Sequence, residues 1–358
     1  MTQKHKHLIV RADIGWCPKE EDLNRISDWI RSLIKKIDMK LLAGPYTTYV
    51  NEKGNKGMTS VAIIETSHIA LHIWDETNPG LMQLDVYSCA DFLPNDVFAQ
   101  DLARVEAFKT HYGAPVWVAM EYRYMPPIAA LKDRFESVTG GLKMLSIREH
   151  RFPFLEKIGD WNRFNANSGG TFVEKCCHFF DLMRLLTGSN PTRIMASGGQ
   201  AVNHLDETYA GAVPDIWDHG YVIVDFENGT KALLELCMFA EGAHFQEEIS
   251  VVGPRGKIEA FVPGPTRFWM NQSQRAPDPK LVISPRHSGL REELEIPVDP
   301  ALLEAGDHNG STFYQHQRFL AVVRQGRAVE VSLNDGIWAV RMGQAAQESA
   351  RLGQAVTF

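Results

Sequence analysis

The sequence predicts an α+β protein with two antiparallel sheets, a small one followed by a larger one. Short apolar runs rich in β-branched residues recur along the chain between turn residues, a pattern typical of antiparallel strands. At 358 residues the chain is long enough for about two domains. We therefore expect a small antiparallel sheet with helices, followed by a larger, mostly antiparallel open sheet with helices on one face.

Composition excludes several classes of function. The formal net charge of −7 and the lack of a basic run argue against a nucleic-acid partner. No apolar stretch reaches the roughly 18 residues needed to span a bilayer, so no membrane partner is expected. Five cysteines, an odd number without a CxxC pair, predict reduced thiols, a cytoplasmic location and no metal site.

The first hundred residues contain the clearest secondary-structure signals. Residues 20–38 repeat apolar side chains at helical spacing, with acidic residues first and basic residues last. Thr59–Ile64 and Ile69–Trp74 are apolar runs, and Leu81–Tyr87 alternates like a half-buried strand. These three segments predict an antiparallel unit of neighbouring strands.

A polar step interrupts this unit and provides its candidate site. Ser67 and His68 lie between the first two apolar runs, His72 follows five residues after Ser67, and Cys89 ends the third run. A hydroxyl, two imidazoles and a thiol in one unit form a possible catalytic set. The alternative is that they are turn and packing residues, with Cys89 an ordinary buried thiol.

This segment resembles the prokaryotic S-adenosylmethionine decarboxylases. The matching pieces are Ser67-His68-Ile69, His72, Trp74 and the run from Asp85 to Cys89, and the resemblance covers roughly residues 4–98. It implies that Ser67 is the precursor of a pyruvoyl cofactor, formed when the hydroxyl attacks the preceding carbonyl and the chain is cleaved. A pyruvoyl carbonyl condenses with a substrate amine and accepts electrons during decarboxylation.

Roles for the other residues follow from the same resemblance. His72 would assist processing, Cys89 would reprotonate the product, and His68 would contact the substrate. The sequence departs from the family at one position, where Thr66 stands in place of the usual Glu. A β-branched residue at the scissile Thr66–Ser67 bond is expected to slow the attack on its carbonyl.

Beyond residue 100 the pattern changes to that of a second family. Residues 101–112 predict a helix and Pro115–Met120 a strand, and strands are expected at 220–226, 231–239 and 248–253, with a two-residue turn at Asn228-Gly229. The segments Tyr122-Arg123-Tyr124 and Gly169–Gly188 resemble the C-terminal domain of the glucose–fructose oxidoreductase and inositol dehydrogenase (Gfo/Idh/MocA) superfamily. This resemblance covers about residues 101–358 and sets the expected domains at 1–100 and 101–358.

Glu174 and His178 are the candidate pair of this second part. Their i, i+4 spacing would place both on one face of a helix, where they could hold a hydroxyl group and take its proton. The resemblance favours this role, and the alternative is a surface ion pair. Tyr124 and Trp161 are weaker candidates for substrate binding, together with Arg123, His150, Arg151 and Asn162, and for each of them a packing or surface role is the favoured alternative. Asp218, His219, His308 and Asn309 could line the same pocket or equally be polar loop residues.

The sequence lacks the nucleotide-binding features of that superfamily. No G-x-G-x-x-G and no Glu-Lys-Pro occur, so NAD(P) is not expected to bind this chain. Residues 101–120 would be a remnant of the last helix and strand of the missing domain. We expect Pro115–Met120 to pair with the N-terminal sheet.

Three functions are therefore consistent with the sequence. The first is a pyruvoyl-dependent decarboxylase of the polyamine pathway type, fused to a dehydrogenase-type substrate domain. The second is a sugar- or inositol-type oxidoreductase family member without its nucleotide-binding half. The third is a non-catalytic fusion scaffold. In the first two, the partner is a small amine or polyol, and a homo-oligomer is expected.

Overall fold

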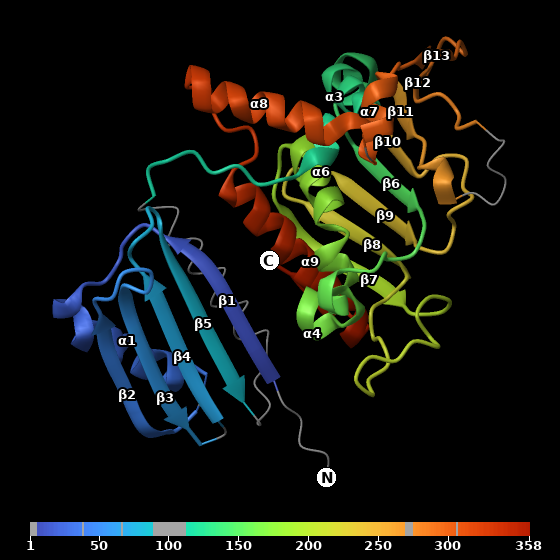
Figure 1. The fold of residues 1–358 in the computed structure, drawn as a ribbon. Coiled ribbons are helices and arrows are strands. Elements are labelled where there is room, and N and C mark those ends of the chain that lie inside the picture. Colours follow the sequence, from blue (N-terminus) through green and yellow to red (C-terminus); the bar gives the residue numbers. More distant parts are fainter. Residues whose placement is uncertain (1–5, 38, 66, 89–111, 269–274, 306) are drawn as a thin grey trace. The chain divides into compact units, whose positions relative to one another are not determined.

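The structure is a computed structural model that describes residues 6–37, 39–65, 67–88, 112–268, 275–305 and 307–358. The chain divides into two compact units, Met1–Asp101 and Leu102–Phe358 (Figure 1). The predicted helix at 101–112 lies almost entirely outside the described residues. Among the described residues, no helix has both the length and the hydropathy needed to cross a membrane.

The first unit is a five-stranded antiparallel sheet packed against one helix. The strand order is β1-β5-β4-β3-β2. Ile26, Ile30 and Ile34 of the helix are buried against the apolar face of the sheet. The elements are β1 (Lys6–Ile14), η1 (Glu20–Asp22), α1 (Leu23–Lys36), β2 (Leu41–Val50), β3 (Gly57–Ile64), β4 (Ser67–Trp74) and β5 (Gly80–Ser88).

The predicted helix and the three predicted strands of this unit are confirmed, whereas β2 was not predicted. Its sequence contains Gly44 and Pro45, and its pairing with β3 shifts register on both sides of Ala43. Gly44 has φ +89°, a conformation that glycine adopts without strain. A Gly-Pro pair inside a run normally indicates a break, so the irregularity hides this strand from pattern analysis.

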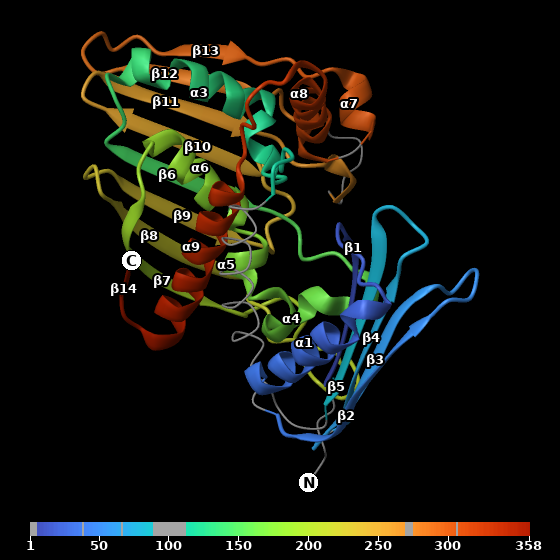
Figure 2. The same ribbon diagram turned by 90° about the vertical axis from the view of Figure 1, so that its left-hand side faces the viewer.

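The second unit is a nine-stranded sheet with helices on one face (Figures 1 and 2). Its order is β13-β12-β11-β10-β6-β9-β8-β7-β14, and every pair is antiparallel except β6–β9. The strands are β6 (Met144–His150), β7 (Pro191–Gly199), β8 (His219–Phe226), β9 (Lys231–Cys237), β10 (Glu247–Gly253), β11 (Gly256–Val262), β12 (Lys280–Pro285), β13 (Glu292–Glu295) and β14 (Val356–Thr357).

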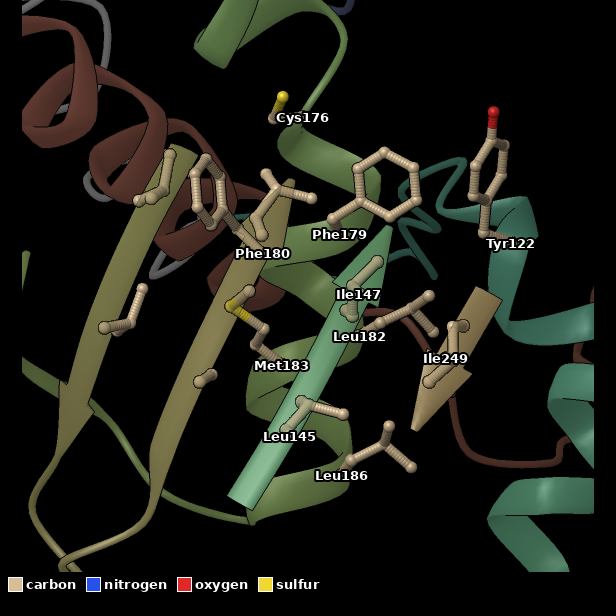
Figure 3. Packing of buried hydrophobic residues seen from close by; sticks show 14 of the residues in the cluster. Tyr122, Leu145, Ile147, Cys176, Phe179, Phe180, Leu182, Met183, Leu186 and Ile249 are labelled. Carbon is tan, nitrogen blue, oxygen red and sulfur yellow. The ribbon is translucent and has the colours of Figure 1, made fainter. Parts of the chain in front are cut away.

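Helices α3, α6 and α9 cover the sheet and enclose the core. Figure 3 shows α6 side chains, among them Phe180, Met183 and Leu186, in one apolar cluster with β6 and β10 residues such as Ile147 and Ile249. The helical elements are η2 (Glu121–Tyr124), α3 (Pro126–Thr139), η3 (Ile158–Arg163), α4 (Asn165–Ser168), α5 (Thr171–Glu174), α6 (Cys177–Thr187), η4 (Thr266–Phe268), α7 (Pro300–Ala305), η5 (His308–Gly310), α8 (Ser311–Gln325) and α9 (Leu333–Leu352).

The predicted strands at 220–226, 231–239 and 248–253 are confirmed as β8, β9 and β10. The turn between β8 and β9 is one residue longer than predicted. The Phe226 N–H donates to the Thr230 carbonyl, so Glu227, Asn228 and Gly229 form the loop. Gly229 has φ +83°, which explains the preference for glycine at the end of this loop.

The predicted strand at Pro115–Met120 is not formed. This segment is irregular, and its Val118 N–H donates to the Val331 carbonyl within the second unit. Met120 is buried with Val331 and Ala339, and Trp117 and Val118 pack beside them. The expectation that this segment extends the N-terminal sheet was therefore wrong. Its apolar side chains are buried by packing against the C-terminal helices instead.

Candidate functional site

In the first unit, strand pairing places Ser67 beside the end of β5. Ser67 is the first residue of β4, and its Cα partner on β5 is Ser88. Ser88 directly precedes Cys89, the predicted proton donor. The side chain of Ser67, and the residues Thr66 and Cys89, lie outside the described part of the structure. The described backbone thus brings Ser67 and the residue next to Cys89 to the same end of the sheet.

His72 lies at a different place on the same strand. Its Nδ1 is 3.2 Å from Thr59 Oγ1, and its ring stacks on Trp74 at 5.7 Å between centroids. His72 and Ser67 are five residues apart on β4, a span of about 16 Å along the strand. His68 is exposed on the same face as His72.

In the second unit, the predicted pair Glu174 and His178 does not share one helix. α5 ends at Glu174 and α6 begins at Cys177, and the Cys176 N–H reaches back five residues to the Thr171 carbonyl. Among the described residues, no hydrogen bond joins Glu174 to His178. The His178 ring instead stacks on Tyr122, with 4.5 Å between centroids, and its Nδ1 lies 3.7 Å from Glu121 Oε2.

This break in the helix turns Lys175 into the interior, where it lies 6% exposed. The Lys175 Nζ is 3.0 Å from Glu149 Oε1 and donates a hydrogen bond to the Tyr122 hydroxyl. It also lies 4.8 Å from the centroid of the Tyr122 ring. Lys175 was not predicted as a site residue, because a continuous helix would have been expected there.

Two glutamates face each other across neighbouring strands beside Lys175. Glu149 on β6 and Glu247 on β10 are Cα partners, and both are almost completely buried. Arg151 Nη1 lies 3.6 Å from Glu149 Oε1, and the Gln246 side-chain amide donates to Glu247 Oε1 at 2.6 Å. We refer to Glu149, Arg151, Lys175 and Glu247 as the buried-charge cluster.

Sequence reasoning missed both glutamates, although a signal was present. On β6, Glu149 continues the buried alternation of Leu145 and Ile147. On β10, Glu247 begins the buried alternation that continues with Ile249. A carboxyl group in line with the core-facing residues of a strand predicts a buried ionic or functional site.

Burial and neighbouring charges set the protonation of these groups. Burial and Glu149 raise the pKa of Glu247, which favours its protonated form. Burial and the Lys175 ammonium lower the pKa of His178 well below its ordinary value, and they lower the pKa of His308 to about 3. Both imidazoles are therefore neutral at pH 7. Their Nδ1 atoms are buried and have no hydrogen-bond partner among the described residues.

A cavity of about 410 Å³ opens beside the buried-charge cluster, and Glu247 belongs to both. Its volume lies within the range of about 300–1,000 Å³ usual for small-molecule sites. His308 and Asn309 have φ values of +67° and +52°, a left-handed conformation rare for residues other than glycine. The described lining comprises Phe152, Gln246, Glu247, Pro263, Gly264, Pro265, Arg267, Arg275, Ala276, Pro277, Asp278, Pro279, Leu303, Asp307, His308 and Asn309.

Several predicted site residues lie elsewhere and have structural contacts. The Tyr124 hydroxyl donates to Glu330 at 3.1 Å, and Arg123 forms a buried two-point hydrogen bond with Asp181. Trp161 is exposed on η3. The remaining candidates also have partners within the protein. His150 contacts Glu235, and Asn162 donates to the Leu155 carbonyl. Asp218 contacts His219 and accepts from the backbone N–H groups of residues 201–203.

The described residues contain no group of three or more histidine, cysteine, aspartate or glutamate side chains placed to hold a metal ion. The candidate site of the second unit is therefore a set of buried charges beside a cavity whose lining includes the neutral imidazole of His308.

Two family models match the chain, one in each unit. The model of the S-adenosylmethionine decarboxylases matches residues 6–112. The model described as the C-terminal alpha/beta domain of an oxidoreductase family matches residues 136–358. The two resemblances found in the sequence are thus confirmed.

Curated relatives match part of the chain at low identity. The rhizopine catabolism protein MocA of Rhizobium meliloti is 29% identical over 139 residues, 38% of each chain. The uncharacterized oxidoreductase YrbE of Bacillus subtilis is 25% identical over 250 residues, covering 69% of this chain and 64% of YrbE. A third relative is the myo-inositol dehydrogenase Hyg17 of Streptomyces leeuwenhoekii. The chain spans 38% to 64% of the length of these three relatives.

Solved structures share the fold. A myo-inositol dehydrogenase from Corynebacterium glutamicum is similar with a TM-score of 0.52 at 20% identity, over 72% of this chain and 70% of that one. An aldose–aldose oxidoreductase from Caulobacter crescentus, complexed with glycerol, has a TM-score of 0.52 at 17% identity, over 72% and 69%. Because the C-terminal model covers well over half of the sequence, the chain belongs to the oxidoreductase family defined by this alpha/beta domain.

Proposed function

We propose that the second unit binds a small polyhydroxylated molecule in the cavity beside Glu247. The observation that carries this proposal is the buried-charge cluster, because its side chains are expensive to bury and one of them, Glu247, lines the cavity. Replacing buried ion pairs by apolar residues is often neutral or stabilising, so the fold alone does not require them. Perturbed ionisable groups beside a cavity are typical of functional sites.

The chemistry of the cavity suits hydroxyl groups. A neutral His308, the carboxyl of Glu247 and the amides of Gln246 and Asn309 together offer hydrogen-bond donors and acceptors. The names of related proteins support the same class, since they include myo-inositol dehydrogenases and a complex with glycerol.

The described residues do not fit a nicotinamide dinucleotide. One sheet is wholly antiparallel, and in the other the described strands include a single parallel pair, β6–β9. A dinucleotide site needs parallel strands, a glycine-rich turn and a helix N-terminus at the pyrophosphate, and the sequence has no G-x-G-x-x-G. We therefore assign polyol binding to the second unit and derive no hydride transfer.

A second candidate function belongs to the first unit, namely pyruvoyl-dependent decarboxylation. It is supported by the match to the S-adenosylmethionine decarboxylases and by the pairing of Ser67 with Ser88, next to Cys89. Ser67 and His72 are five residues apart on β4, about 16 Å along the strand.

Calorimetric titration of the full chain with myo-inositol tests the primary proposal. We expect saturable binding that weakens about tenfold, or about 1.4 kcal/mol, in Glu247→Ala, because a buried hydrogen-bonding group is lost. Glu248→Ala is the matched control, since Glu248 is the next residue on β10 and pairs outward with Arg148. Glu248→Ala should bind within twofold of the unmodified chain. Absence of saturable binding to the unmodified chain contradicts the proposal.

A further inference from the structure

We infer that the second unit carries two complementary surfaces through which one copy of the chain binds another, head to tail. One surface consists of residues 155–161 and 202–213, which we call the exposed loop pair. The other is the outer side of α8 with Phe313, Leu320, Val323 and Arg324, which we call the α8 stripe. The inference goes beyond the proposed polyol binding and does not depend on it.

The exposed loop pair presents several large apolar side chains to solvent. Ile158 is 99% exposed, and the exposed apolar set is Leu155, Ile158, Trp161, Val202, Leu205 and Val213. A single exposed apolar residue is ordinary on a protein surface, whereas a group of them marks an interaction site.

The buried residue Arg163 joins the two loops. Its Nε donates to Glu207 Oε2 at 2.9 Å, and its Nη1 donates to the Leu155 carbonyl at 3.4 Å. The Asp215 N–H in turn donates to the Arg163 carbonyl at 3.2 Å. The exposed apolar side chains therefore belong to one connected structure and not to two independent loops.

The backbone of the exposed loop pair is held in an unusual conformation. The φ values of Asp160, His204 and Ala210 are +50°, +60° and +48°. Left-handed backbone is unfavourable for residues other than glycine and persists where surrounding contacts fix it. His204 is fixed by its Nδ1, which lies 2.8 Å from Glu207 Oε1. The loops thus have a defined shape, as a specific interface requires.

The exposed loop pair has an excess of negative charge. Its sequence contains four carboxylates and one lysine, Lys157. One carboxylate, Glu207, is paired with Arg163, and the other three outnumber the lysine. Anionic lipid repels a negative surface, so this charge favours a basic protein partner over a membrane.

The α8 stripe is also apolar and exposed. At 3.6 residues per turn, Phe313, Leu320 and Val323 fall on one side of the helix. Their side chains are 47%, 44% and 61% exposed. Helix α8 packs on the rest of the unit through its opposite side, where Gln315 and Val322 are buried.

The charge of the α8 stripe is opposite to that of the exposed loop pair. The sequence of α8 contains no acidic residue. Arg318 is paired with Glu330, whereas the exposed Arg324 and the nearby Arg327 form no ion pair within the described part of the chain. One copy therefore offers both halves of a contact, an acidic apolar surface and a basic apolar surface.

The two surfaces lie at opposite ends of the second unit. Figures 1 and 2 show α8 at one end of the nine-stranded sheet and the loop that follows β7 at the other. Contact between two like surfaces would bring like charges together, so charge favours the exposed loop pair of one copy on the α8 stripe of the next. Such a contact closes into a ring or continues as an open chain, according to the rotation between copies.

Sedimentation velocity of the full chain tests this contact. We expect an average mass that exceeds 40.3 kDa and rises with concentration. The useful concentrations are about 1–100 µM, the range of weak association. Association should be weaker at about 0.5 M than at about 0.05 M NaCl, because salt screens exposed charges.

Charge reversal on either surface should weaken this association at least about tenfold. The loop variant Glu156→Lys/Asp206→Lys makes the exposed loop pair basic, and the helix variant Arg324→Glu/Arg327→Glu makes the α8 stripe acidic. All four positions are exposed, so both variants should fold.

A mixture of the two variants makes the test specific. In an equimolar mixture, each loop pair can meet an α8 stripe of opposite charge, so association should return to within about threefold of the unmodified chain. A chain that carries all four substitutions should behave in the same way. Ile158→Asp should weaken association, whereas Leu290→Asp, at a leucine 75% exposed outside both surfaces, is the control and should not.

Four results would overturn the inference. The unmodified chain could remain at 40.3 kDa at every concentration, or both charge variants could associate as well as it does. The mixture and the fourfold variant could fail to recover. Finally, the unmodified chain could bind phosphatidylcholine vesicles and lose that binding in Ile158→Asp, which would assign the exposed loop pair to a membrane surface. None of these results bears on the myo-inositol titration, so polyol binding is judged separately.

Discussion

Lys175→Met is expected to lower the free energy of unfolding of the second unit by about 3 kcal/mol at pH 7. The substitution keeps much of the buried volume but removes the ammonium 3.0 Å from Glu149. Breaking a buried ion pair on one side costs about 3–5 kcal/mol, because an uncompensated charge remains in the interior. Arg151, 3.6 Å from the same carboxylate, stays in place and keeps the loss near the lower bound.

The double variant Glu149→Gln/Lys175→Met provides the decisive control for this charge effect. The double variant leaves neither the carboxylate of Glu149 nor the ammonium of Lys175, and only the buried Arg151 loses a partner, so we expect part of the lost stability to be recovered. Lys143→Met, at an exposed lysine of the same unit, should change stability by less than about 0.5 kcal/mol. The free energy of unfolding of each variant is measured by urea denaturation, with hydrogen exchange of the β6 and β10 amides as the readout. A double variant less stable than Lys175→Met would contradict the account.

Ser67→Ala is expected to change the covalent state of the whole chain. If the first unit is processed, the unmodified protein gives two species by denaturing mass spectrometry, one ending at Thr66 and one starting with a pyruvoyl group at position 67. Without the hydroxyl, the carbonyl of Thr66 is not attacked, and Ser67→Ala gives a single species near 40.3 kDa.

Two further variants make this result specific. Ser88→Ala removes a hydroxyl from the residue that is the Cα partner of Ser67 on β5 and should still be cleaved. Thr66→Glu removes the β-branched side chain at the scissile bond and should be cleaved faster. A single uncleaved species from both the unmodified chain and Thr66→Glu would rule out the decarboxylase function of the first unit.

Much of the fold could be predicted because hydrophobic periodicity is set by local geometry. β3, β4 and β5 follow from alternating apolar residues, and α1 follows from helical spacing. Pro115–Met120 shows the limit of this reasoning. An apolar run must be buried, but its backbone need not join a sheet: here the Val118 N–H donates to the Val331 carbonyl and the Met120 N–H donates to the Val118 carbonyl. The hydrophobic pattern alone does not say whether such a run joins a sheet or packs as an irregular segment.

The candidate site was less predictable than the fold. The spacing of Glu174 and His178 assumed a continuous helix, whereas the break before Cys177 directs Lys175 into the core. Such a break depends on tertiary packing and leaves no simple local signal. Glu149 and Glu247 could have been found, because each continues the buried face of its strand. Their pairing across β6 and β10 depends on strand order, which the sequence did not reveal.

Hydrogen–deuterium exchange of the full chain, with and without saturating myo-inositol, tests directly whether the second unit binds a polyol. We expect slower exchange in the segments that form the cluster and cavity, namely residues 149–152, 174–178, 246–247 and 308–309. We expect no change in β3, β4 and β5 of the first unit. Protection confined to residues 57–88, or none near Glu247, would contradict the assignment of polyol binding to the second unit.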